Sequence, residues 1–428
     1  MPITEITTER EVSLSEAAER AHRLLDQRGW QAHYDDLGHG ATVTAWRCTL
    51  HDAHGHPIPG GTGAGKGHTD AARVGAVFEA IEHYTSRHPE LHHADIAPHP
   101  AGTVAEALGP DPITAVLAAD PEVPVGCVRY HAAEEPQHEL LAPAALSVPY
   151  YCAEDHADQR RTLGDHADYR VLARYASNSG SAIGTSHNEA LLHALNEAIE
   201  RDALSLLLVR AFLAERAYRP QVLDVDTLPG ELVEMTTAVE NHLGDSVWLV
   251  EITTDIGVPT VLAYTPPSTH HPRHRRGLGT SLSRHHAIYR ALGELLQGEL
   301  VGEVTLTEQL AHLADYHTGL HRCATFDLGA HLAHAETIPY RPTPGHQAPA
   351  DQVEAVLAHL RAAGYTAYTR TLGQHTLPIV HALVPGLERF MTILQGVLNL
   401  PGPRAHHHRN APGEHLPAQR TSPEPNGS

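Results

Sequence analysis

The chain has 428 residues, of which 41% are hydrophobic and 19% charged, which is enough apolar material for a folded core and excludes a wholly disordered protein. Its 51 acidic residues outnumber its 30 basic ones and give a formal net charge of −21, so it lacks the basic character of proteins that bind nucleic acids or anionic membranes. The sequence has neither the run of about 18 apolar residues that spans a membrane nor a signal peptide in its acidic start, MPITEITTER. We therefore expect a cytoplasmic protein that binds no nucleic acid and no membrane.

The spacing of apolar residues predicts helices and strands that do not alternate strictly, which favours an α+β fold over a doubly wound sheet. The predicted helices are 13–28, 70–87, 187–212, 229–242, 283–300 and 351–363. The predicted strands are 41–50, 124–130, 247–254, 258–265, 365–371 and 378–384. Loops are expected at 51–70, which is rich in glycine, and at 270–280, which is rich in arginine and histidine.

The composition divides the chain into three expected segments. Residues 1–58 contain one helix and one strand, residues 59–400 contain the main body of the protein, and residues 401–428 are dense in Pro, Gly and His without apolar periodicity. A segment of that last composition buries too little apolar surface to become ordered, so we expect it to be a disordered tail.

The glycine-rich segment that ends at Lys66 matches a phosphate-binding P-loop only in part. Residues 60–66 fit the pattern G-x-x-x-x-G-K, but Gly67 follows where a P-loop needs Ser or Thr to bind magnesium. We also expect no buried strand before it. The segment is therefore not interpreted as a P-loop, although Lys66 remains a good point charge for an anion.

Two acidic residues mark the helix predicted at 70–87. Glu79 and Glu82 are three residues apart, so they share one face of that helix. Taken alone, a solvated acidic stripe explains this pair without any function.

Three further carboxylates, Glu189, Glu197 and Glu200, fall on one stripe of the longest predicted helix, at about 100° per residue. A structural explanation is open, because Glu189 can close a capping box with a preceding serine and Arg201 can neutralise Glu197 one turn away. A functional explanation is equally open. Crowded carboxylates repel one another and need a cation, and hard oxygen ligands select magnesium.

Arg290, Glu294 and Gln297 share one face of the helix predicted at 283–300, which follows the basic segment. This face is interpreted either as solvated surface or as a contact for phosphate or peptide. The sequence leaves both interpretations open.

Taken together, five ordered motifs make the chain resemble the YcaO family between about residues 60 and 390. The motifs are GKGHT (65–69) with FEAIEHY (78–84), SNSGSAIG (177–184) with NEALLHALNEAIERDA (188–203), TTDIGVP (253–259), GLGTSLSRHHAIYRALGELLQ (277–297) and IVHALVPGLERF (379–390). The second motif is highly specific. The resemblance implies a catalytic domain over 59–400 that has mixed sheets with packed helices and binds ATP without a P-loop.

The resemblance also implies which residues hold the cofactors, ATP and Mg²⁺. The family's magnesium ligands correspond to Glu79, Glu82, Glu189, Glu197 and Glu200. Its nucleotide contacts correspond to Lys66, Ser179, Thr185, Arg201 and Gln297. With these roles, the solvated-stripe explanation of Glu79 and Glu82 is replaced by a magnesium site.

Members of the family activate a backbone amide of a peptide by phosphorylating its oxygen from ATP. A Cys, Ser or Thr side chain as nucleophile gives an azoline, an external sulfur source gives a thioamide, and an amine gives an amidine. The resemblance therefore implies an azoline-forming cyclodehydratase that acts on a ribosomally made peptide natural product. Thioamide or amidine formation, and a non-catalytic scaffold, are the alternatives.

Several positions depart from the family pattern. His83 stands where Arg is common, Thr185 where Asn is common, and SNSG replaces the usual S-N-G. The C-terminal sequence SPEPNGS differs from the P-x-P-x-P ending of many cyclodehydratases, which weakens the azoline interpretation. Residues 1–58 are short for a leader-recognition domain, so we expect a partner protein that presents the precursor peptide or delivers sulfur. A homodimer is left open.

Overall fold

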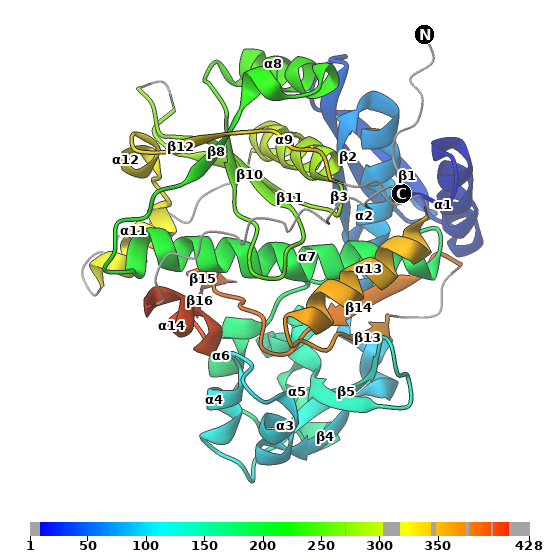
Figure 1. Ribbon diagram of the computed structural model, residues 1–428. Helices are drawn as coiled ribbons and strands as arrows, with labels where there is room; N and C mark the ends of the chain where they lie inside the picture. The colour runs from blue at the N-terminus through cyan, green and yellow to red at the C-terminus, as the bar shows by residue number, and fades with distance from the viewer. Residues whose placement is uncertain are drawn as a thin grey trace, which may run out of the picture.

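The computed structural model of the chain, shown in Figure 1, describes residues 9–269, 271–302, 317–343, 348–372, 376–394 and 397–410. Helices and mixed sheets pack around one long helix, α7 (His187–Leu208), which crosses the middle of the molecule. The α+β class predicted from the sequence is confirmed. In the described part of the chain, no helix is both long and apolar enough to cross a membrane.

The first part of the chain forms an antiparallel sheet of order β1-β2-β3 with two helices packed against it. Its elements are α1 (Leu14–Arg28), β1 (Gln31–Asp36), β2 (Val43–His51), β3 (Pro57–His68) and α2 (Thr69–Arg87). Leu24, Leu50 and Ile81 from α1, β2 and α2 belong to one apolar core. Strand β3 crosses the boundary expected at residue 58, so the N-terminal segment and α2 form one unit.

Strand β3 occupies the segment for which the sequence predicts a glycine-rich loop, and that prediction is wrong. A Cβ atom on Gly63 would lie 2.3 Å from the backbone N of Ala80, and one on Gly65 would lie 1.9 Å from the carbonyl O of Ala72. The glycines therefore serve close packing of α2 against the strand rather than flexibility.

A second sheet has the order β11-β10-β9-β8-β12. Its strands are β8 (Gln221–Asp224), β9 (Trp248–Glu251), β10 (Thr260–Thr265), β11 (Arg275–Thr280) and β12 (Glu336–Pro339). The helices of this region are α8 (Gly230–Leu243), α9 (Arg284–Val301), α11 (Thr318–Thr325) and α12 (Gly329–Leu332). Apolar side chains of α8, α9 and β10 share one core.

The predicted basic loop at 270–280 is likewise wrong in its second half, which is strand β11. A Cβ atom on Gly277 would lie 2.1 Å from the backbone N of Leu295, and one on Gly279 would lie 2.0 Å from the carbonyl O of Ala287. Glycines thus bring α9 onto β11 just as they bring α2 onto β3.

A third sheet has the order β4-β5-β13-β14-β7, with β6 paired to β5. Its strands are β4 (Ala97–Pro100), β5 (Pro124–Ala132), β6 (Glu139–Pro143), β7 (Ser181–Ile183), β13 (Tyr368–Thr371) and β14 (Ile379–Leu383). Four short helices belong to this region: α3 (Ala101–Leu108), α4 (Thr114–Ala118), α5 (Ala157–Leu163) and α6 (Tyr169–Leu172). A short hairpin, β15 (Ile393–Leu394) and β16 (Val397–Leu398), follows.

Helix α7 packs against the second and third sheets. Strands β7, β11 and β14 and helix α13 (Pro349–Ala362) pack against it, and it continues as a π-helical turn over Val209–Leu213. Most of its side chains are buried, so its polar residues need partners inside the protein.

Helix α14 (Pro403–Asn410) lies in the segment expected to be a disordered tail. For residues 401–410 that expectation is wrong, because Ala405 is fully buried and Arg404 forms ion pairs with Asp202 and Asp255. Residues 411–428 lie outside the described part of the chain.

Candidate functional site

The two acidic residues of α2 are partly buried and contact two different sheets. Glu79 accepts a hydrogen bond from the backbone N–H of Ala64 in β3 at 2.7 Å and lies 3.5 Å from the His83 ring. Glu82 accepts one from the backbone N–H of Ile183 in β7 at 3.1 Å. The close packing of α2 on glycines therefore fixes both carboxylates between two sheets.

The middle turns of α7 carry the next carboxylates. Glu197 Oε1 lies 3.4 Å from the Arg201 guanidinium, as the i, i+4 spacing predicted. Glu200 is 2% exposed, and its Oε2 has no hydrogen-bond partner. A buried carboxylate oxygen without a partner is costly, so this position is suited to a ligand.

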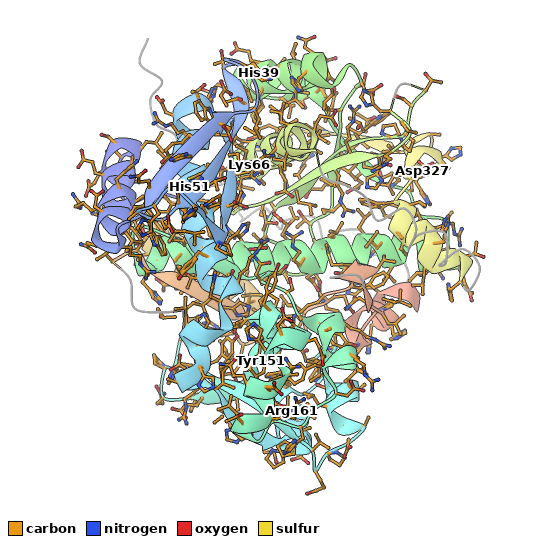
Figure 2. The ribbon with its side chains drawn as sticks, turned by 180° about the vertical axis from the view of Figure 1, so that it is seen from behind. His39, His51, Lys66, Tyr151, Arg161 and Asp327 are labelled. Atoms are coloured by element: carbon orange, nitrogen blue, oxygen red, sulfur yellow. The ribbon has the colours of Figure 1, made fainter. Side chains whose placement is uncertain are left out.

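Helix α9 supplies the third side of the site. Lys66 Nζ on β3 lies 2.7 Å from Glu294 Oε2, and Gln297 donates a hydrogen bond to the backbone carbonyl of Ala64. Figure 2 labels Lys66 in a view from behind the molecule. The charge of Arg290 acts on Glu197, Glu200 and Glu294. Charged side chains from β3, α7 and α9 thus lie close enough to act on one another.

The crowding of carboxylates shows in their pKa values. Burial, followed by the charges of Glu197 and Glu79, raises the pKa of Glu82 well above its usual range. Burial and then the neighbouring Glu294 raise the pKa of Glu200 to about 7. Burial lowers the pKa of Arg201, but the surrounding glutamates outweigh it and raise that pKa instead. The two glutamate shifts thus arise first from burial and then from neighbouring carboxylates, and the Arg201 shift arises from the glutamates around it.

Glu189 sits in a different environment, at the first turn of α7. Ser186 accepts a hydrogen bond from the Glu189 backbone N–H, which is one half of the predicted capping box. For the other half, the Glu189 carboxylate accepts from the N–H of Thr185, one residue before the expected Ser186. Glu189 Oε2 accepts hydrogen bonds from the backbone N–H and hydroxyl of Thr185 at 2.7 and 2.6 Å, and Oε1 accepts one from the N–H of Glu11. Glu197 is eight residues further on, about 12 Å along the axis. The family resemblance predicts magnesium ligation by Glu189 and nucleotide contact by Thr185, whereas the hydrogen bonds at both Glu189 oxygens favour a structural role for this carboxylate.

The N-terminal segment reaches this end of α7, which the sequence does not indicate. Glu9 is 1% exposed and accepts a hydrogen bond from the Ser281 hydroxyl. Its carboxylate lies 3.3 Å from the His286 ring and 3.6 Å from the His193 ring. The charge of Arg10 acts on both Glu9 and Glu189. Residues before the first helix are thus built into the site.

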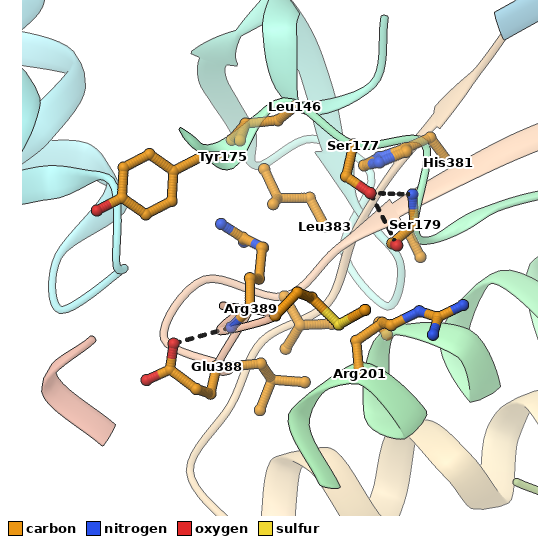
Figure 3. Close-up of a pocket in the computed structure, with 14 residues that line it drawn as sticks. Leu146, Tyr175, Ser177, Ser179, Arg201, His381, Leu383, Glu388 and Arg389 are labelled. Atoms are coloured by element: carbon orange, nitrogen blue, oxygen red, sulfur yellow. Dashed lines mark hydrogen bonds between the residues drawn. The ribbon is translucent and has the colours of Figure 1, made fainter. Parts of the chain in front are cut away.

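A pocket opens beside Arg201, between α7 and the chain that follows β14 (Figure 3). Ser179 lines it, with its hydroxyl 2.8 Å from that of Ser177. Its other walls are largely apolar and include Leu383 and Leu387. Ser179 and Arg201, both expected to contact nucleotide, therefore line one pocket.

The residues present fit a divalent cation and a phosphate. In the residues that the structure describes, no three His, Cys, Asp or Glu side chains form a ready-made metal site. Glu200 nevertheless has an orphaned buried oxygen, and Arg201 and Arg290 each have a buried Nε without a partner. Carboxylate oxygens are ligands that Mg²⁺ prefers, and guanidinium groups are donors that phosphate oxygens accept.

For two residues of this site the sequence left open a solvated surface or a contact for phosphate or peptide. Arg290 and Glu294 share a helix face with Gln297, but only Gln297 was carried over as a nucleotide contact. The i, i+4, i+7 spacing was the available signal. For Glu9, by contrast, no local pattern existed.

The comparisons with known proteins identify the family. The family model described as YcaO cyclodehydratase, ATP- and Mg²⁺-binding, matches residues 64–388. The chain belongs to the YcaO family. The predicted resemblance is confirmed, and so are ATP and Mg²⁺ as the predicted cofactors.

Two sequence relatives illustrate how far the similarity extends. A protein of Methanothermobacter thermautotrophicus is 29% identical over 352 residues, which cover 76% of this chain and 82% of the relative. A protein encoded in the tfuA 3′ region of Rhizobium leguminosarum bv. trifolii is 28% identical over 130 residues, 30% of this chain and 28% of the relative.

Two solved structures share the fold. One is YcaO from Methanopyrus kandleri bound with AMPPCP and Mg²⁺, with a TM-score of 0.62 and 21% identity over 92% of this chain and 96% of that one. The other is a heterocyclase in complex with substrate and cofactor, with a TM-score of 0.58 and 17% identity. The match covers 89% of this chain and 53% of the heterocyclase, about half its length.

Proposed function

We propose that this ATP-dependent enzyme activates a backbone amide of a precursor peptide and forms an azoline from a Cys, Ser or Thr residue. The observation that carries the proposal is that carboxylates of α2 and α7 lie within electrostatic reach of one another and of Lys66 and Arg201 in a partly buried cluster. The description of the family as cyclodehydratases supports the choice of ring formation.

In this proposal the acidic residues bind magnesium and the basic residues bind the phosphates of ATP. Glu79, Glu82, Glu197 and Glu200 would hold magnesium, because their oxygens are hard ligands and their mutual repulsion is relieved by a cation. Lys66 and Arg201 would orient the phosphates, each donating N–H groups to phosphate oxygens. ATP supplies the phosphoryl group that turns the amide oxygen into a leaving group.

The steps of the proposed reaction determine which groups the pocket beside Arg201 must hold. The side-chain nucleophile loses its proton and adds to the amide carbon, and the amide oxygen takes the γ-phosphoryl group as ADP leaves. Phosphate then departs with that oxygen while the amide nitrogen loses its proton and the C=N bond of the azoline forms, so the peptide loses one water in total. The mostly apolar walls beside Arg201 would hold the peptide and limit competing hydrolysis by water.

Thioamide or amidine formation is the second candidate, because the activated amide is the same whichever nucleophile follows. The C-terminal sequence SPEPNGS, which differs from the P-x-P-x-P ending of many cyclodehydratases, favours keeping it. The departures at His83 and Thr185 are the reason to keep a non-catalytic scaffold as a further alternative. For either product, a partner protein that presents the peptide or delivers sulfur is part of the proposal, and the oligomeric state is left to measurement.

The first test is calorimetric titration of ATP into the full chain, with and without Mg²⁺. We expect binding that depends on Mg²⁺. The second is mass spectrometry of candidate peptides incubated with the chain, ATP and partner. Loss of one water establishes a ring, and exchange of oxygen for sulfur establishes a thioamide. Absence of nucleotide binding under both conditions would contradict the proposal.

A further inference from the structure

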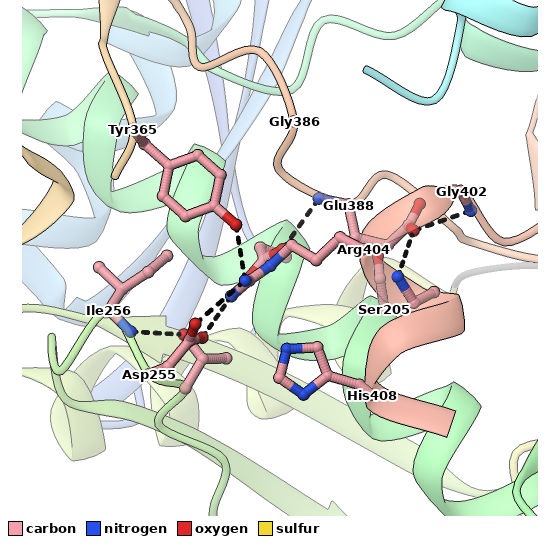
Figure 4. Close-up of polar contacts among 12 residues, drawn as sticks. Ser205, Asp255, Ile256, Tyr365, Gly386, Glu388, Gly402, Arg404 and His408 are labelled. Carbon is pink, nitrogen blue, oxygen red and sulfur yellow. Dashed lines mark hydrogen bonds and ion pairs between the residues drawn. The ribbon is translucent and has the colours of Figure 1, made fainter. Parts of the chain in front are cut away.

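The end of the described chain returns to α7 and forms a buried ion-pair network around Arg404 (Figure 4). Arg404 Nε and Nη2 lie 2.7 and 2.9 Å from the two carboxylate oxygens of Asp202, a bidentate pair. The same guanidinium also bonds Asp255 and donates to the Tyr365 hydroxyl at 2.7 Å. Four segments distant in sequence are therefore joined through one side chain.

The pair of Arg404 with Asp202 is buried, whereas Asp255 lies at the edge of the network with 41% of its side chain exposed. Asp202 is 0% exposed, and the Arg404 side chain is 7% exposed. Asp202 also accepts the backbone N–H of Glu388 at 2.8 Å, and Glu388 in turn accepts the N–H of Gly402 at 2.8 Å. Buried bidentate pairs of this kind have narrow geometry, so the network fixes the orientation of the groups it joins.

Asp202 directly follows Glu200 and Arg201 on α7. Successive side chains on a helix point about 100° apart. The bidentate contact of Arg404 with Asp202, which we term the Arg404–Asp202 clamp, therefore holds α7 on a different face from the one on which Arg201 contacts Glu197. Rotation of this turn by a small angle would displace Glu200 and Arg201 together. The Arg404–Asp202 clamp therefore lies beside the turn whose rotation would move the Glu200 and Arg201 side chains.

We propose that Arg404 is a positioning residue of the nucleotide site, which acts through Asp202 to hold the turn of α7 that carries Glu200 and Arg201. The inference rests on the proposed function, because it takes Glu200 and Arg201 to handle magnesium and phosphate. The contacts of Arg404 are with Asp202, Asp255 and Tyr365, so its proposed contribution is the placement of Glu200 and Arg201.

The experiment compares Arg404→Gln with His407→Ala, a change at an exposed position of the same helix. Affinity for ATP at saturating Mg²⁺ is measured by calorimetry on full chains, at a temperature well below each unfolding midpoint. We expect Arg404→Gln to weaken binding about ten-fold, because small displacements of positioned groups have large effects. His407→Ala binds like the wild type.

A double variant separates positioning from stability. Arg404→Gln leaves Asp202 buried without its cation, whereas Asp202→Asn with Arg404→Gln removes both charges and recovers part of the lost thermal stability. We expect ATP affinity to stay low in the double variant. Recovery of affinity in step with stability would show that the clamp is only structural.

Arg404→Lys keeps the proposal testable if Arg404→Gln does not fold. It keeps the charge but loses the two-pronged contact, so we expect an affinity between those of the wild type and Arg404→Gln. Wild-type affinity in a folded Arg404→Lys or Arg404→Gln variant overturns this inference alone. A wild-type chain that binds no ATP overturns the proposed function instead.

Discussion

The first turn of α7 and its middle turns both bury glutamates, but they treat the carboxylates differently. At the first turn, Glu189 receives hydrogen bonds at both oxygens from Thr185 and Glu11. At the middle turns, Glu200 keeps an oxygen without a partner and lies near the charge of Glu294. A buried carboxylate that the chain itself satisfies stabilises the fold, whereas one left unsatisfied suits a cation.

The largest effect is expected for Glu200→Gln. The amide keeps the shape of the side chain but lacks the charge that binds magnesium, so we expect loss of ATP turnover by at least about 100-fold. Circular dichroism and thermal unfolding would show an intact fold, since a buried repulsion has been removed. Full turnover in this variant would remove the basis for the comparison and for the proposed function.

Glu189→Gln is expected to lower the stability of the fold rather than ATP binding. It loses charge-assisted hydrogen bonds from Thr185 and Glu11, which costs about 1–3 kcal/mol of unfolding free energy. Magnesium-dependent ATP binding should stay close to that of the wild type. If calorimetry instead shows binding lost and denaturant unfolding shows stability unchanged, Glu189 is a magnesium ligand, as the family resemblance implies.

The pH dependence of stability and of ATP affinity tests the same difference between the first and middle turns of α7, with smaller expected effects. Burial and Glu294 raise the pKa of Glu200 from 4.5 to about 7. The folded, unliganded chain therefore binds this proton more tightly than the unfolded chain does, and its contribution to stability falls as pH rises between about 4.5 and 7. Affinity for ATP with Mg²⁺ should rise toward pH 7, because the ionised carboxylate is the ligand.

Thermal unfolding and calorimetry over a pH series would reveal these opposite slopes. Glu200→Gln is the control and should lack the contribution of this group in both. If the stability and the ATP affinity of the wild type change in the same direction with pH, Glu200 is not the titrating group.

Lys66→Gln is expected to produce the smallest change in this comparison. The positive charge of Lys66 lowers the pKa of both Glu200 and Glu294. Its removal should move the pH midpoint of ATP affinity upward by less than about one unit, in addition to weakening phosphate contact. Calorimetry at several pH values measures the shift, and a midpoint that stays in place or moves downward would contradict the coupling of Lys66 to the middle turns of α7.

Local patterns in the sequence were sufficient for much of the fold and for part of the site. The predicted helices and strands are present, because apolar periodicity reflects which face packs inward. The stripe that joins Glu197 to Glu200 and Arg201 follows directly from helix geometry. The segments ending in Lys66 and Thr280 were misassigned as loops, because glycine signals both flexibility and close packing, and only the neighbouring helix distinguishes them.

The sequence by itself determined the family, the α+β class and the residue types needed for magnesium and phosphate. It did so because motifs and helical spacing are properties of neighbouring residues. Only the tertiary structure decided which carboxylates are satisfied, that Glu9 reaches the first turn of α7, and that Arg404 clamps Asp202. Those pairings join residues far apart in sequence, 202 positions for Arg404 with Asp202 and 272 for Glu9 with Ser281, and their free energy depends on burial and on partners that no local pattern specifies.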